Sequence, residues 1–127
     1  MTTTLYETTG ERLLSTTTVS LAADAETSIY IVPSGQRCVL TKALLVVGAN
    51  ANSTDITIGA NGAETDWLNT TQCDNLDAAN DVGILQPVPA GTMPKSKSYA
   101  AGTDIRLVVA NQAGGASNTL YLFGFLY

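Results

Sequence analysis

The sequence predicts an all-β fold, an antiparallel β-sandwich that is jelly-roll-like and has about eight strands. Helical periodicity is nearly absent, runs of β-branched and aromatic residues recur, and clusters of Gly, Pro, Asn and Asp separate the runs. An open meander or a small barrel is the alternative topology. A chain of 127 residues is the size of one domain. We expect one sandwich domain over residues 13–127, preceded by a Thr-rich N-terminal arm or edge strand over residues 1–12.

The first half of the chain carries four strand signals. Leu13–Ala22 is rich in β-branched residues, and Ser28–Val32 alternates apolar and polar residues before the turn residues Pro33–Gly35. Arg37–Val47 is the strongest strand, and its second half is apolar at successive positions, as in a strand that is covered on both faces. Asp55–Gly59 alternates and is followed by an Asn-Gly turn.

The second half predicts four more strands. Asp66–Thr71 holds the single Trp, and Val82–Gln86 is a short apolar run that ends before a Pro-rich stretch. Ile105–Val109 alternates after a Gly-Thr-Asp turn, and Leu120–Tyr127 closes the chain. Between these strands, Asp74–Asp81 is the one stretch that could form a short helical turn, with Asp74 as its N-cap.

Composition limits the classes of partner. Charged residues make up 13% of the chain and the net charge is −5, so we predict neither direct nucleic-acid binding nor attachment to an anionic membrane. A surface of small neutral polar residues with few charges favours an assembled state. The N-terminus has no secretory signal, so we expect a cytosolically made chain in which Cys38 and Cys73 are buried thiols; a disulfide between them is the alternative.

The sequence contains no histidine, which removes His-based triads, Cys–His dyads and imidazole metal sites. We therefore predict no catalytic residue, no cofactor and no metal site, and a protein that is not an enzyme. Two hypotheses of a ligand site stay open. Trp67, beside Glu64 and Asp66, is either an aromatic residue of the core or of an interface, with the acids flanking a loop, or a stacking platform for a sugar, with the two carboxylates as candidates for glycoside chemistry. The oxygen-rich stretch Asp74–Asp81 is a candidate cation loop.

The C-terminal strand carries the best interaction signal. Its leucines fall on one face, and Tyr121, Phe123, Phe125 and Tyr127 fall on the other. One face is needed for the core of the domain. The aromatic face must be covered either by another part of the domain or by another subunit. We predict these four aromatic residues as an oligomer interface, in a dimer or trimer, and keep burial within the domain as the alternative.

A sequence pattern common in small structural proteins of tailed bacteriophages is an apolar strand, a Pro-x-Gly turn and a long strand that lead to a hairpin. This chain resembles that pattern in Ile29–Arg37, followed by Val39–Val47 and by Asp55–Gly59. The resemblance covers residues 28–127. Tyr99–Ile105 and Gly124–Tyr127 also look like the final strands of a jelly roll of the tumour-necrosis-factor type.

The phage resemblance implies a virion structural protein, foremost a capsid decoration (cement) protein that self-associates and stabilises the shell. Its partners would be copies of itself and the major capsid protein or other virion proteins, and its location would be the virion. A carbohydrate- or receptor-binding module of a phage tail is the alternative, and Trp67 would be its ligand platform.

Overall fold

The structure, a computed structural model, describes residues 10–87 and 97–127. The described part of the chain is all-β, without helix, and contains nine strands. In chain order they are β1 (Arg12–Val19), β2 (Ala25–Ile31), β3 (Cys38–Val46), β4 (Asp55–Ala60), β5 (Ala63–Gln72), β6 (Val82–Leu85), β7 (Ser98–Tyr99), β8 (Asp104–Ala110) and β9 (Asn118–Leu126). The predicted antiparallel β-sandwich is confirmed.

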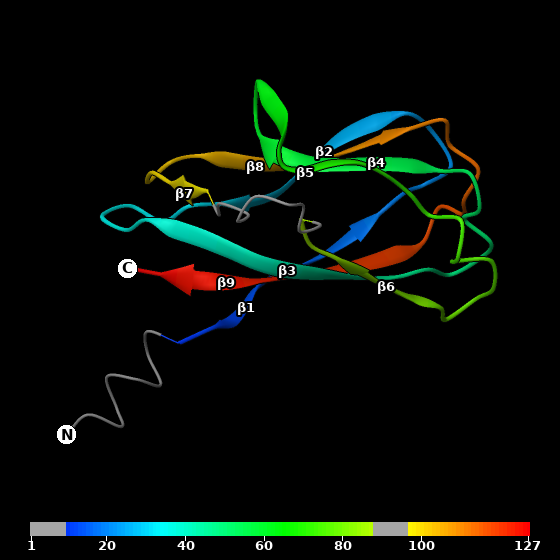
Figure 1. The fold of residues 1–127 in the computed structure, drawn as a ribbon, viewed down its shortest axis with the longest axis horizontal. Helices are drawn as coiled ribbons and strands as arrows, with labels where there is room; N and C mark the ends of the chain where they lie inside the picture. The colour runs from blue at the N-terminus through cyan, green and yellow to red at the C-terminus, as the bar shows by residue number, and fades with distance from the viewer. Residues whose placement is uncertain (1–9, 88–96) are drawn as a thin grey trace, which may run out of the picture.

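The strands form two sheets that face each other (Figure 1). Sheet A has the order β1-β9-β3-β6, with β7 also paired to β3, and sheet B has the order β2-β8-β4-β5. Every pairing is antiparallel. Only the β4–β5 and β6–β7 connections stay within a sheet, and the first strand pairs with the last. This wrapping is that of a jelly roll.

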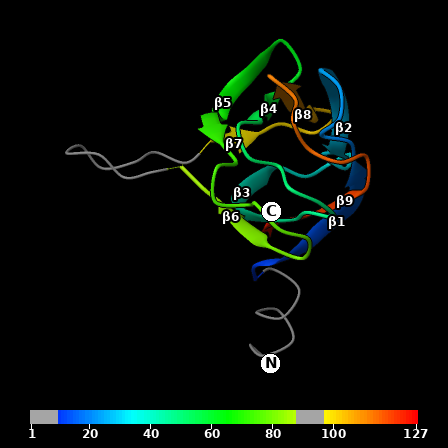
Figure 2. The same ribbon diagram turned by 90° about the vertical axis from the view of Figure 1, so that its right-hand side faces the viewer.

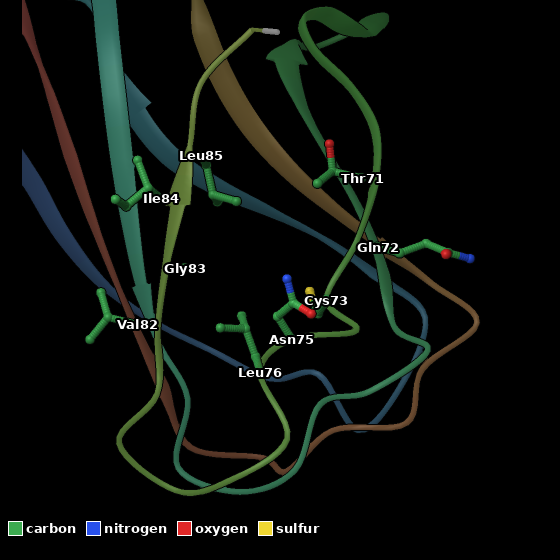
Figure 3. Close-up of a pocket in the computed structure, with 9 residues that line it drawn as sticks. All are labelled: Thr71, Gln72, Cys73, Asn75, Leu76, Val82, Gly83, Ile84 and Leu85. Atoms are coloured by element: carbon green, nitrogen blue, oxygen red, sulfur yellow. The ribbon is translucent and has the colours of Figure 1, made fainter.

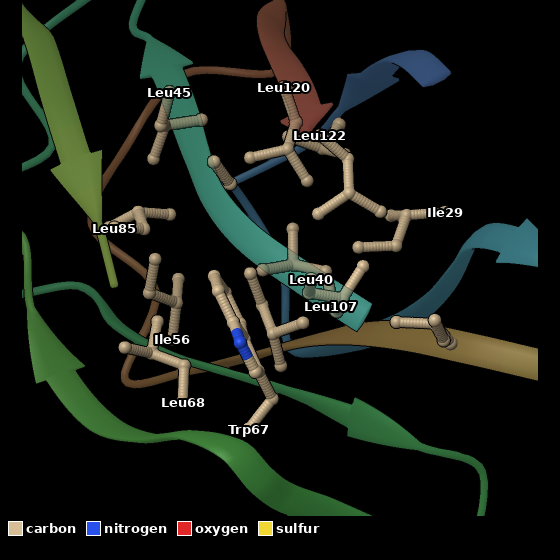
Figure 4. Packing of buried hydrophobic residues seen from close by; sticks show 14 of the residues in the cluster. Ile29, Leu40, Leu45, Ile56, Trp67, Leu68, Leu85, Leu107, Leu120 and Leu122 are labelled. Carbon is tan, nitrogen blue, oxygen red and sulfur yellow. The ribbon is translucent and has the colours of Figure 1, made fainter. Parts of the chain in front are cut away.

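Seen from the end, the two sheets enclose one core between them (Figure 2). Alternate residues of β3, β8 and β9 point into it, because successive side chains of a strand lie on opposite faces. Leu40, Leu45, Leu107, Leu120 and Leu122 are among its largest fully buried side chains. The leucines of β3 and β9 in sheet A interdigitate with Leu107, Ile29, Ile56 and Trp67 of sheet B (Figure 4).

A polar contact ties the two sheets together at one end. Asp66 on β5 of sheet B accepts a hydrogen bond from the hydroxyl of Tyr99 on β7 of sheet A, with 2.6 Å between the oxygens. The same carboxylate accepts a bond from the backbone N–H of Ala60 at 3.2 Å and pairs with Lys97 at 3.4 Å. The absence of a Cβ on Gly59 makes room for this carboxylate, since a side chain there would clash with its oxygen.

At the opposite end a buried amide joins three segments. Asn118, of which 2% is exposed, donates hydrogen bonds to the carbonyls of Val19 at 3.0 Å and Gly115 at 2.8 Å. Its side-chain oxygen accepts a bond from the backbone N–H of Gly48 at 3.0 Å. The loops after β1, after β3 and before β9 are thereby held by one side chain whose polar atoms are satisfied.

The observed strands differ from the predicted ones at their ends. β5 begins at Ala63, three residues before the predicted Asp66, and β7 was not predicted as a strand. The helical turn suggested for Asp74–Asp81 is wrong, because those residues form a loop of turns and bends. Of the predicted N-terminal arm, residues 1–9 lie outside the described residues.

We predict that Asn118→Ala lowers the free energy of unfolding by about 1–3 kcal/mol, because it removes the partner of the partly buried N–H of Gly48 and a donor from each of the carbonyls of Val19 and Gly115, of which Gly115 keeps only the N–H of Leu21. Urea denaturation followed by circular dichroism measures this change. Asn75→Ala, at an exposed loop position, is the matched control and should change the stability by less than about 0.5 kcal/mol. Equal effects of the two substitutions would contradict the assigned role of Asn118.

Candidate interaction surface

The outer face of β9 carries a row of aromatic side chains. Leu120, Leu122 and Leu126 of this strand are buried between the sheets. The intervening residues point away from sheet B, and we call them the aromatic row: Tyr121, Phe123, Phe125 and Tyr127. Exposure rises along the row, from half-buried at its first two residues to 36% at Phe125 and 62% at Tyr127.

The aromatic row is part of a wider apolar surface. The registers of sheet A place apolar residues of β1, β3 and β6 on the same outer face. Together with the aromatic row they form what we call the apolar face: Leu13, Val39, Leu44, Val46, Val82 and Ile84. Its most exposed members besides Tyr127 lie on β6, where Val82 is 52% and Ile84 is 68% exposed. Within residues 10–87 and 97–127, nothing covers this face.

The outer face of sheet B is different in kind. Arg106 on β8 pairs with Asp104 at 2.8 Å and with Glu26 on β2 at 3.2 Å. Ser28 donates a hydrogen bond to the other oxygen of Asp104, and this bond is the main cause that lowers the pKa of that carboxyl. Ile31 is the one large apolar residue on this sheet that is mostly exposed among the described residues. The sandwich therefore has one charged outer face and one apolar outer face.

One cation, Lys42, lies in the middle of the described part of the apolar face. The ammonium of Lys42 on β3 is 5.0 Å from the ring centroid of Phe123 and 3.6 Å from a carboxylate oxygen of Glu11. Both charged side chains are more than a third exposed, so the ion pair contributes little to stability. The carboxylate of Glu11 also accepts a hydrogen bond from Thr41 at 2.6 Å, which holds it against β3.

Tyr127 is fixed at the end of the aromatic row. Its backbone exchanges two hydrogen bonds with that of Arg37, and its hydroxyl lies 2.6 Å from that of Ser98. Arg37 in turn donates to the hydroxyl and the carbonyl of Ser98. The hydrogen bond with Ser98 is the main cause that lowers the pKa of Tyr127. These contacts hold an exposed phenol in one position instead of burying it.

The structure places Trp67 in the core, where 5% of its surface is exposed (Figure 4). Both faces of a ring at that depth are occupied by apolar neighbours, so it has no free face on which a sugar could stack. The suggested ligand-stacking role of Trp67 is therefore wrong. It was suggested because aromatic rings beside carboxylates are typical of sugar sites. A bulge in β5, between its pairings with Ile58 and Ala60, turns both Trp67 and Leu68 inward.

The two acidic stretches form no convergent site. Asp66 is engaged by Tyr99, Ala60 and Lys97, as described above, and is a structural residue. In the loop after β5, Asp74 accepts a hydrogen bond from the backbone N–H of Ser53, and Asp81 accepts one from Ala78. Among the described residues, no group of three or more Cys, Asp or Glu side chains is arranged to hold a metal ion.

A shallow hollow of about 280 Å³ lies between the edge strands of the two sheets (Figure 3). Thr71 and Cys73 border it from the end of β5, and Leu76 and Leu85 border it from the loop and from β6. Figure 3 shows Val82 and Ile84 pointing to the opposite side of β6 from Leu76 and Leu85. Within the described chain the hollow brings together no acid, base or nucleophile other than one thiol.

Both cysteines are free and buried. Cys38 begins β3, and Cys73 follows β5. Burial raises the pKa of each thiol to about 11, and for Cys73 the carboxylates of Asp55 and Asp74 add to the effect. Such thiols are poor nucleophiles and poor metal ligands, because only the thiolate reacts.

The comparisons with known proteins give one finding on the fold. No protein-family model matches the chain, and no curated protein matches it by sequence. A chain in the acid-stable capsid structure of Helicobacter pylori bacteriophage KHP30 is similar in fold, with a TM-score of 0.59 and 15% sequence identity. The likeness covers 91% of this chain and 86% of that one. The fold is thus shared with a chain of a phage capsid structure, which agrees with the resemblance to phage structural proteins that the sequence suggested.

None of the residues that the structure describes lies in a helix long and apolar enough to cross a bilayer.

We predict that the fluorescence of the single Trp reports a buried ring. The native protein should emit at shorter wavelength than the unfolded protein and resist quenching by acrylamide, because Trp67 is 5% exposed. Added oligosaccharides should leave both properties unchanged. A native spectrum as red and as easily quenched as that of the protein in concentrated urea would contradict the core position.

The thiols should react with Ellman's reagent only after unfolding. With a pKa of about 11, roughly one thiol in 1,000 is ionised at pH 8, compared with about a quarter at the ordinary value near 8.5. Since burial also blocks access, we expect no fast phase in the native protein at pH 8 and two equivalents of fast reaction in concentrated urea. A fast native reaction of either thiol would show that its side chain is accessible.

Proposed function

We propose that the protein is a non-enzymatic structural subunit of a phage virion, and specifically a decoration or cement subunit of the head shell. It self-associates, binds the assembled shell of the major capsid protein, and stabilises that shell. Its place would be the mature virion.

The observation that carries this proposal is the contrast between the two outer faces. The largest apolar patch on a soluble monomer typically measures about 300–600 Å² and is often functional, and larger patches mark protein–protein contacts. Here the patch spans sheet A, from Leu13 on β1 to Ile84 on β6. Aromatic side chains, which are enriched at the energetic centres of interfaces, lie in its middle.

The fold likeness supports a virion role. A chain in a phage capsid structure has the same fold over nearly its whole length. The present chain also keeps the composition expected of an assembling protein, with 13% charged residues. The buried Trp67 removes the main support for the alternative function, a carbohydrate-binding module of a phage tail.

The two functions, self-association and binding to the shell, would use different surfaces. The apolar face binds further copies of the protein, and the charged outer face of sheet B, with the loops at the ends of the sandwich, remains available to the shell. Any ligand that binds the assembled shell more tightly than its separated subunits raises the free energy needed to open the shell. A subunit that bridges neighbouring capsid proteins acts in this way.

We predict that the purified protein co-sediments with assembled heads that lack it and does not bind free major capsid protein. At saturation it should stabilise the heads, because binding at 100 times the dissociation constant contributes about 2.7 kcal/mol per site. The temperature at which the heads release their DNA, followed with an intercalating dye, should rise on addition of the protein.

Heads that already carry a full complement of the protein are the control and should take up no more. Failure to co-sediment with stripped heads, at protein concentrations up to the millimolar range, would rule out the decoration role.

A further inference from the structure

We infer that the apolar face is occupied by second copies of this chain in a closed ring of at least three subunits, in which the outer side of β6 of one copy packs on the aromatic row of the next. This inference rests on the proposed function and specifies its self-association. The contact joins two different patches: the aliphatic edge, Val82 and Ile84, and the aromatic row.

The two patches lie side by side on one sheet but differ in shape and chemistry. The aliphatic edge is on the last strand of sheet A and projects, with Ile84 68% exposed. The aromatic row lies two strands further in, beyond β3, at a spacing of roughly 10 Å. Phe123 and Tyr121 there are already half-buried by their neighbours. The exposed aliphatic side chains of one copy can pack on the partly buried rings of the next.

Charge favours the contact between unlike patches. A two-fold contact of row on row would bring the Lys42 ammonium of one copy near that of the other, because Lys42 lies over Phe123 in the middle of the face. Both ion pairs with Glu11 would then lose water. Val82 and Ile84 carry no charge, so docking them beside Phe125 leaves Lys42, Glu11 and Arg37 at the rim of the contact.

The area available for contact also favours the ring. Four strands about 4.8 Å apart and about seven residues long present a flat face of roughly 500 Å², whereas a standard stable interface needs about 800 Å² from each partner. An edge contact also buries the flank of β6, whose outer backbone edge has no partner strand in the described chain. In a ring each copy contributes both patches, one to each neighbour.

The ring also gives the free protein a way to stay in solution. A subunit made before it meets a finished head must cover its apolar face with something that is always present, and copies of itself meet that condition. Contacts between unlike patches close into a ring when the rotation between neighbours permits, and otherwise extend into fibres. A soluble protein therefore requires closure.

The test uses two single variants of the full-length protein and their mixture, with native mass spectrometry as the measurement. The wild type should have the mass of three or more chains. Ile84→Asp and Phe125→Asp should each be monomeric at micromolar concentration. Each places a charge in one of the two patches that every contact between subunits requires. Mixed in equal amounts, the two variants should form a dimer and nothing larger. The intact aliphatic edge of Phe125→Asp can bind the intact aromatic row of Ile84→Asp, and the remaining patches of that dimer are both mutated.

Ile31→Asp is the matched control, since Ile31 is an equally exposed aliphatic residue on the outer face of sheet B; it should keep the wild-type mass. Circular dichroism and the urea midpoint check that each variant is folded, which is expected because both mutated side chains reach the surface.

A wild-type dimer would overturn the ring, and so would an oligomer that survives Ile84→Asp. A wild-type monomer that still binds heads would overturn the ring while leaving the decoration role intact, with the shell itself then covering the apolar face. A ring that forms as described but ignores heads would overturn the decoration role alone.

Discussion

The structure depends on the two-residue alternation of its central strands. β8 and β9 place every second side chain between the sheets, β3 does the same on either side of its bulge at Leu40–Lys42, and these side chains contribute much of the fully buried core. The same alternation leaves the other half of each strand to face outward. In β8 that half contains Asp104 and Arg106, while in β3 and β9 it is largely aliphatic and aromatic. Sheet A is therefore apolar on both faces, and its outer face is the main feature that the fold of one chain does not explain.

The polar interactions act locally, at the two ends of the sandwich. Asp66 with Tyr99, and Asn118 with the carbonyls around it, lie at opposite ends of the sandwich and join segments that are distant in sequence. Burial and the hydrogen bond to Asp66 both raise the pKa of Tyr99, so the phenol stays protonated and able to donate. Each of these side chains satisfies backbone or carboxylate groups that would otherwise be buried without a partner. They fix how the sheets and loops meet, and the leucines and isoleucines supply the bulk of the buried surface.

Much of the fold could be predicted from the sequence. Leu120, Leu122 and Leu126 alternate with aromatic residues so regularly that the two faces of β9 follow from spacing alone. The role of Trp67 could not be read in this way, because the bulge in β5 puts two consecutive residues, Trp67 and Leu68, on the inner side. A bulge depends on the partner strand and leaves no simple mark in a single sequence.

The apolar face was predicted only in part. The aromatic row was visible as a pattern within one strand, but the contribution of Val82 and Ile84 was not. Their four-residue strand reads as an ordinary apolar run, and only the pairing of β6 with β3 shows that these two side chains face outward beside Leu44 and Val46. Which residues of different strands share a face is set by register, and register is a property of the folded sheet.

The pairing of the first strand with the last has a mechanical consequence. Arg12 lies opposite Gly124, and the chain then runs antiparallel to itself along β1 and β9. A force that pulled Arg12 and Tyr127 apart would peel this ladder open one hydrogen bond at a time, the geometry in which a sheet yields most easily. In the proposed role on a head shell, pressure from a packed genome would have to load the subunit through its broad faces, where many side chains resist together, and not by pulling on these two strand ends.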